Sequence, residues 1–157
     1  MPLQIQATLA TPLSQANDNP RAMAARRAAI YYQNAIPSAA YTSTQTSSTF
    51  FVGPAQTLDV FFVPTVAGGG TGVNPRIETQ DPQSGAWIPV AGTAAALTGA
   101  SNIGYQIGPS ATKFGGMSNS SFNAYQFQLH GLCRIIVAHS DAASWTYSVN
   151  IKVSGPG

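Results

Sequence analysis

A strict alternation of apolar and polar residues is the clearest pattern in the chain. From Trp145 to Val153 every second residue is apolar, and the residues between them are small or polar. Successive side chains of a β-strand point to opposite faces of the sheet, so this period of two predicts a strand with one buried face. We expect this strand to pair with residues 132–139 across a turn at residues 140–143.

Shorter segments with the same period precede this strand. They lie at residues 58–62, 103–107 and 125–129. Residues 76–80 and 86–90 flank Asp81-Pro82-Gln83-Ser84-Gly85, a run of turn-forming residues that predicts a hairpin. About eight short strands separated by loops are typical of an all-β protein, namely an antiparallel β-sandwich or jelly-roll.

The first 34 residues differ from the rest of the chain. Their three prolines break them into short extended pieces, and only residues 21–29 have strong helix propensity. We therefore predict two parts. An extended N-terminal arm of residues 1–34 contains one short helix, and residues 35–157 form the β-sandwich domain.

Charge is scarce, and the arm carries the excess. Charged residues make up 8% of the chain, against about 25% in an ordinary soluble domain. A surface so poor in charge is weakly protected against association, which favours a homo-oligomeric subunit whose surface is covered by neighbours. Arg21, Arg26 and Arg27 oppose only Asp18 in the arm, whereas the charges of residues 35–157 balance. We interpret these arginines as contacts to an acidic patch on a partner.

Two pairs of adjacent phenylalanines supply candidate contact residues. Phe50-Phe51 and Phe61-Phe62 each place one ring on either face of a predicted strand. We expect one ring of each pair in the core, and we select Phe51 and Phe61 as outward rings that bind a partner or lie under the arm. Trp87 and Trp145 are interpreted as core residues.

The sequence contains no recognisable catalytic or metal-binding pattern. His130 and His139 are nine residues apart, and Cys133 is the only cysteine, so no zinc-binding spacing is present. Residues 68–72 are glycine-rich but lack the lysine of a phosphate-binding loop, and are interpreted as a flexible loop. We therefore predict that the protein is not an enzyme and uses no cofactor or metal.

Other classes of partner and of chemistry are also disfavoured. Three arginines are too few for a nucleic-acid-binding surface, and no apolar run approaches the ~18 residues that cross a membrane. Asp141 is interpreted as a turn residue that bonds its own backbone. Asp59 and Glu78 are expected on adjacent strands, with their carboxylates in solvent near Arg76, rather than as a catalytic pair.

Several segments resemble small auxiliary virion proteins of tailed bacteriophages. The first is Arg76-Ile77-Glu78-Thr79-Gln80-Asp81-Pro82-Gln83-Ser84-Gly85-Ala86-Trp87. The others are Tyr105-Gln106-Ile107-Gly108-Pro109, Arg134-Ile135-Ile136-Val137 and Ser144-Trp145-Thr146-Tyr147-Ser148-Val149. The resemblance covers residues 58–153. It implies a capsid decoration, head-stabilising or other auxiliary role, and it carries over no functional residues.

The sequence thus favours a non-enzymatic structural protein of a phage particle, made in the host cytoplasm. We expect a capsid decoration protein that binds the major capsid protein or other virion subunits through the arm and the outward aromatic rings. The alternative is a carbohydrate- or receptor-binding sandwich on a phage tail or fibre. That alternative needs Trp87 or Trp145 to be exposed.

Overall fold

The computed structural model describes most of the predicted β-domain. It describes residues 31–53, 56–93, 95–109, 111, 120–126, 128–129 and 131–155. The expected arm helix, with Arg21, Arg26 and Arg27, lies outside the described residues. His130 lies outside them as well.

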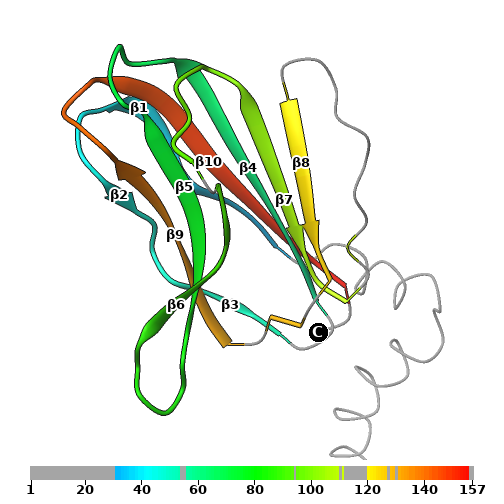
Figure 1. Ribbon diagram of the computed structural model, residues 1–157. Coiled ribbons are helices and arrows are strands. Elements are labelled where there is room, and N and C mark those ends of the chain that lie inside the picture. The colour runs from blue at the N-terminus through cyan, green and yellow to red at the C-terminus, as the bar shows by residue number, and fades with distance from the viewer. Residues whose placement is uncertain are drawn as a thin grey trace, which may run out of the picture.

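The described residues form ten strands in two sheets, and none of them is helical, so the protein is all-β as predicted. Sheet A contains, in spatial order, β1 (Tyr31–Tyr41), β10 (Trp145–Ser154), β4 (Thr57–Val66), β7 (Asn102–Ile107) and β8 (Ser120–Tyr125). Sheet B contains β2 (Gln45–Thr46), β9 (Gly131–His139), β5 (Val73–Gln80) and β6 (Trp87–Gly92), and β3 (Phe50–Val52) also pairs with β9. Figure 1 shows the two sheets as two layers.

One hydrophobic core lies between the sheets. Along β10 every second residue is buried, and Trp145, Tyr147 and Val149 are fully enclosed. Ile77 and Ile135 of sheet B belong to the same buried cluster. The alternation predicted for the C-terminal strand is therefore confirmed, and it is this alternation that gives sheet A an apolar inner face.

The predicted pairing of β9 with β10 is wrong. β10 pairs with β1 and β4 in sheet A, whereas β9 pairs with β2, β3 and β5 in sheet B. Both strands have an apolar face, and residues 140–144 take the chain from one sheet to the other. Each strand can thus turn its apolar face to the core from its own side.

The expectation that all strands are antiparallel is wrong for one pair. β7 and β8 are parallel neighbours, with Asn102 paired to Ser120 and Ile107 to Tyr125. By contrast, the predicted hairpin is confirmed. Gln80 of β5 pairs with Trp87 of β6, and the Asp81 amide donates to the Ala86 carbonyl.

The boundary expected between residues 34 and 35 falls within β1. Tyr31 pairs with Val153, and the pairing with β10 continues to Tyr41, opposite Trp145. The alternation rule does not find this strand, because among its described side chains only Ile36 is buried. β1 lies at an edge of sheet A and contains two irregularities of register as well as Pro37, a residue tolerated at sheet edges.

Candidate functional site

The two phenylalanine pairs behave as their sequence predicts. Phe50 and Phe62 are buried in the core, whereas Phe51 is 64% exposed and Phe61 is 40% exposed. Phe51 lies on β3 and Phe61 on β4, so the outward rings belong to different sheets. The structure thus offers two separate aromatic surfaces, and whether each ring binds a partner stays a prediction.

An apolar hollow adjoins Phe51 on the outer face of sheet B. Phe51 is paired with Leu132 of β9, whose side chain is also exposed. Together with Gln80, Pro82 and Gly131 they line a hollow of about 400 Å³, which we call the apolar hollow. Sequence reasoning missed Leu132, because it begins an apolar run that reads as a buried strand.

The loop that supplies Pro82 is fixed by its own hydrogen bonds. The carboxylate of Asp81 accepts hydrogen bonds from the amides of Gln83 and Ser84 and from the Ser84 hydroxyl. These bonds, the Ser84 hydroxyl first, hold the pKa of Asp81 below its usual value. One wall of the apolar hollow is therefore a turn whose conformation is held by internal hydrogen bonds.

A cluster of two arginines and one glutamate lies beside this hollow. Glu78 is only 4% exposed. Its Oε1 is 2.8 Å from Arg76 Nε and its Oε2 is 2.7 Å from Arg134 Nη2. The Arg134 guanidinium also lies 4.2 Å from the centre of the Trp87 ring, a cation–π distance. We call these residues the arginine cluster.

The expectation that Asp59 and Glu78 lie on adjacent strands with solvent-exposed carboxylates is wrong. Asp59 is on β4 of sheet A and Glu78 is on β5 of sheet B, and both are buried. Both residues do sit at outward positions of their strands. They are covered there by long side chains from neighbouring strands, which a local pattern does not reveal.

A second hollow of about 520 Å³ lies on the other side of the arginine cluster. Its lining includes Asn74, Arg76, Pro89, Thr93 and Tyr125, and we call it the polar hollow. The Thr93 hydroxyl oxygen is buried and has no hydrogen-bond partner among the described residues. The arginine side chain in this lining is 42% exposed. The polar hollow thus offers an accessible cation, whereas the hydroxyl is enclosed by protein.

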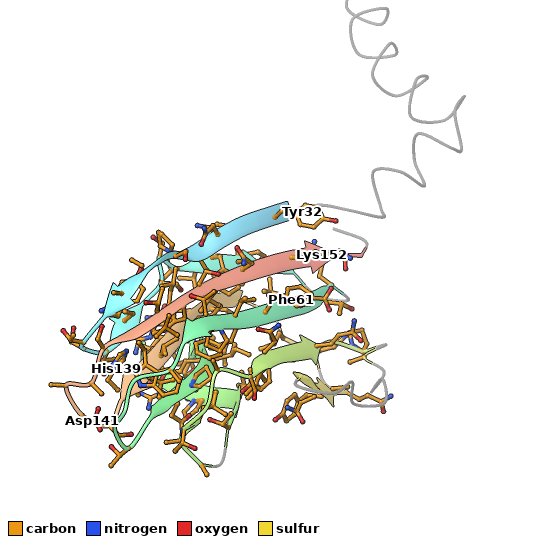
Figure 2. The ribbon with its side chains drawn as sticks, turned by 90° about the horizontal axis from the view of Figure 1, so that it is seen from above. Tyr32, Phe61, His139, Asp141 and Lys152 are labelled. Atoms are coloured by element: carbon orange, nitrogen blue, oxygen red, sulfur yellow. The ribbon has the colours of Figure 1, made fainter. Side chains whose placement is uncertain are left out.

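The outer face of sheet A carries the second aromatic surface. Figure 2 shows Tyr32, Lys152 and Phe61 on the neighbouring strands β1, β10 and β4, near one end of the sheet. Tyr32 is 68% exposed. Lys152 Nζ is 3.8 Å from Asp59, whose carboxylate also accepts a hydrogen bond from Gln106. This surface therefore consists of two exposed aromatic rings and a lysine whose charge is balanced by Asp59.

The glycine-rich residues 68–72 form a loop that is attached to the β9–β10 turn. Asp141 accepts hydrogen bonds from the amide and hydroxyl of Thr71, and also from the Ala143 amide. Gly72 has φ +102°, and a Cβ there would lie 2.1 Å from the Leu97 carbonyl oxygen. The loop and the self-bonding role of Asp141 are confirmed, and the Asp141 carboxylate also ties the loop to the turn through Thr71.

The remaining reactive side chains are engaged in the fold. His139 Nε2 lies 3.1 Å from the Tyr147 hydroxyl. Burial raises the pKa of the Cys133 thiol to about 11, so it is not a reactive thiolate at neutral pH. Among the described residues no group of His, Cys, Asp and Glu has the arrangement of a metal site. Within the same residues no helix is long and apolar enough to cross a membrane.

The two tryptophans differ in accessibility. Trp145 is completely buried, as predicted. The interpretation of Trp87 as a core residue is wrong, because it is partly exposed and lies on the outer face of sheet B, where the Arg134 guanidinium covers its ring. Sugar-binding tryptophans stack an open ring face on the ligand. The Trp145 ring is enclosed, and one face of the Trp87 ring is covered by Arg134.

Comparisons with known proteins give little beyond this description. No protein-family model matches the chain, and no curated protein matches it. Among solved structures it is similar to a chain of "Structure of infectious bursal disease virus Gx strain", at 15% sequence identity and a TM-score of 0.39. The match covers 81% of this chain and 32% of that one. The chain therefore spans about a third of that chain's length, and a likeness this distant tells us nothing about its partners.

Proposed function

We propose that the protein is a non-enzymatic structural subunit of a phage particle. Its role would be that of a capsid decoration or stabilising protein that binds the major capsid protein. The apolar hollow carries the proposal, because Phe51 and Leu132 are large apolar side chains held side by side in solvent. Exposed apolar patches bordered by polar residues mark sites of protein association.

Two features of the sequence support this assignment. Charged residues make up only 8% of the chain, which suits a subunit that is covered by neighbours better than a free monomer. The resemblance of residues 58–153 to small auxiliary virion proteins of tailed bacteriophages is the reason for proposing that the assembly is a phage particle. In this proposal the body is a β-sandwich of jelly-roll type, residues 1–30 are an assembly arm, and copies associate with one another as well as with the shell.

The alternative, a carbohydrate- or receptor-binding module, has less support. It needs an open tryptophan ring, whereas Trp145 is enclosed and Trp87 is stacked by Arg134. The pocket with exposed apolar side chains is lined by Phe51 and Leu132 instead, and it lacks the several polar groups that orient a sugar.

Purified particles of the virus whose genome encodes the chain provide the test. Quantitative mass spectrometry should find the protein in many copies per particle, and antibody labelling in the electron microscope should place it on the head. Labelling confined to the tail or its fibres would favour the alternative. Absence from washed particles would contradict the proposal.

A further inference from the structure

The arginine cluster lies between two hollows of different character beside the outer face of sheet B, and the polar hollow extends to Tyr125 of β8 in sheet A. Glu78 is paired with Arg134 across β5 and β9. Two residues after Glu78 on β5, Gln80 lines the apolar hollow. Two residues before Glu78, Arg76 lines the polar hollow. These two residues are four positions apart on the same face of the strand, which corresponds to about 13 Å at about 3.3 Å per residue.

The charge within the arginine cluster is unbalanced. Two guanidinium groups share the single carboxylate of Glu78, which leaves one positive charge. Arg76 bonds Glu78 through Nε, and among the described residues no further carboxylate lies within ion-pair distance of its two terminal nitrogens. Asp81 is the other acid on this side. It keeps its negative charge, but its carboxylate is hydrogen-bonded within its own turn and is paired with neither arginine among the described residues.

The cation is the group of the polar hollow that a ligand can reach. The Arg76 side chain is 42% exposed, whereas the Thr93 hydroxyl oxygen is enclosed by protein. A carboxylate in this hollow would accept hydrogen bonds from the terminal nitrogens of Arg76. Such charge-assisted bonds to a guanidinium are among the stronger ones in proteins.

We propose that this face binds an extended segment of a partner protein that carries an apolar side chain and a carboxylate four residues apart. The apolar side chain enters the apolar hollow between Phe51 and Leu132, and the carboxylate enters the polar hollow beside Arg76. Residues at positions i and i+4 of an extended chain lie on the same side, at the spacing of the two hollows. The backbone between them crosses the stacked Arg134 and Trp87.

This inference rests on the proposed function only in requiring a protein partner. The probe is the peptide acetyl-Leu-Thr-Thr-Thr-Glu-amide, titrated into the isotope-labelled full chain and followed by NMR. Two matched peptides replace the glutamate by glutamine, or place it directly after the leucine. We expect saturable shifts of Leu132 and Arg76 resonances with the first peptide, and about tenfold weaker binding of the other two.

Variants assign the binding to its two ends. Arg76→Gln should weaken binding of the acidic peptide about tenfold and leave the glutamine peptide unaffected. Phe51→Ser should weaken both peptides. Lys152→Gln removes the same charge from sheet A and serves as the matched control. The NMR spectrum of each variant reports directly whether it is folded.

Equal binding of the acidic and glutamine peptides, or no saturable shift with the acidic peptide, would overturn the inference without any variant. Its failure is distinguishable from that of the proposed function. If the protein is present on phage heads but binds the acidic and glutamine peptides equally, the proposed function stands and the inference is wrong. If it binds the acidic peptide as described but is absent from particles, the inference stands and the proposed function is wrong.

Discussion

β9 and β10 are joined by one turn, yet each is an interior strand of a different sheet. Each also places a cation opposite a buried carboxylate of the next strand. Arg134 of β9 faces Glu78, with 2.7 Å between the charged atoms, and Lys152 of β10 faces Asp59, with 3.8 Å between them. The same arrangement is therefore tight in sheet B and loose in sheet A.

The difference follows from the chemistry of the two cations. A guanidinium is planar, bonds a carboxylate through several nitrogens and stacks on an aromatic ring, as Arg134 does on Trp87. An ammonium on a flexible chain does neither. The outer face of sheet B thus has multiply bonded side chains between two hollows, whereas that of sheet A has a loosely paired lysine between two exposed rings. Fixed surfaces lose less conformational entropy on binding.

The largest expected effect tests whether both strands are equally essential to the core. Val149→Asp in β10 and Ile135→Asp in β9 each bury an unpaired charge, which costs several kcal/mol against a total stability of about 5–15 kcal/mol. Both variants should lose the cooperative thermal transition measured by circular dichroism. Asn150→Lys, on the outer face of β10, should retain it. A folded Ile135→Asp variant would mean that β9 is not a core strand.

The second effect concerns the two carboxylates. Glu78→Gln leaves two arginines without their shared anion and should lower the free energy of unfolding by about 3 kcal/mol. Asp59→Asn should lower it by about 1 kcal/mol, because its lysine partner is distant and reaches water. Urea denaturation measures both. Equal losses would show that the two pairs contribute alike, contrary to their geometry.

The third effect separates the arm from β1, which is the outer neighbour of β10. Removing residues 1–30 should leave the thermal transition unchanged and reduce binding to capsids. Removing residues 1–34 also deletes four positions of the β1–β10 register. It should therefore cost about 1 kcal/mol or more of stability. If the shorter truncation lowered the stability as much, the arm would belong to the body.

The fourth effect compares the exposed rings beside the two strands. Phe51→Ser and Phe61→Ser should each change the free energy of unfolding by less than about 1 kcal/mol, because both side chains already reach solvent. Binding to capsids, measured by co-sedimentation, should fall more for Phe51→Ser, since that ring belongs to the fixed surface. A larger loss with Phe61→Ser would make sheet A the principal interface.

The smallest effect lies where the two strands meet, at His139 and Tyr147. Desolvation lowers the pKa of His139 from 6.5, and the nearby Asp141 offsets this only in part. The unfolded chain therefore binds the proton more readily than the folded one. Stability should be fully present above about pH 6.5 and fall as the pH drops through the lower folded pKa.

The same pH series contains its own control. Hydrogen bonds lower the pKa of Asp81 and Asp141 from 3.8, so their contributions should be lost only at more acidic pH. His139→Gln should remove the slope just below pH 6.5 and leave the acidic one. Thermal midpoints measured across this range would contradict the assignment if the variant kept the upper slope.

The fold was predictable wherever one face of a strand alone decides burial. β10 and the β5–β6 hairpin have alternation or turn residues that act locally, and both were found. β1 was not, because its sequence buries little and owes its place to pairing with β10. The partner of β10 was also wrong, since alternation gives a strand its buried face but says nothing about which sheet it joins.

The candidate site was predictable only in part, for a related reason. Adjacent phenylalanines must point to opposite faces, so one outward ring in each pair follows from the sequence. Leu132 and Glu78 owe their environments to residues brought beside them from other strands. An exposed leucine and a buried glutamate both contradict their usual tendencies, and only the register of β9 with β3 and β5 explains them.

The position of β10 between β1 and β4 sets an order for biosynthesis. Among the described strands β1 pairs in sheet A only with β10, and the partner of Tyr41 is Trp145, more than a hundred residues later in the chain. A ribosome therefore releases β1 long before its partner exists. Pairings between such distant segments form slowly and leave unpaired edges exposed in the meantime. We expect the nascent chain to need either dilution or a chaperone until residues 145–154 emerge.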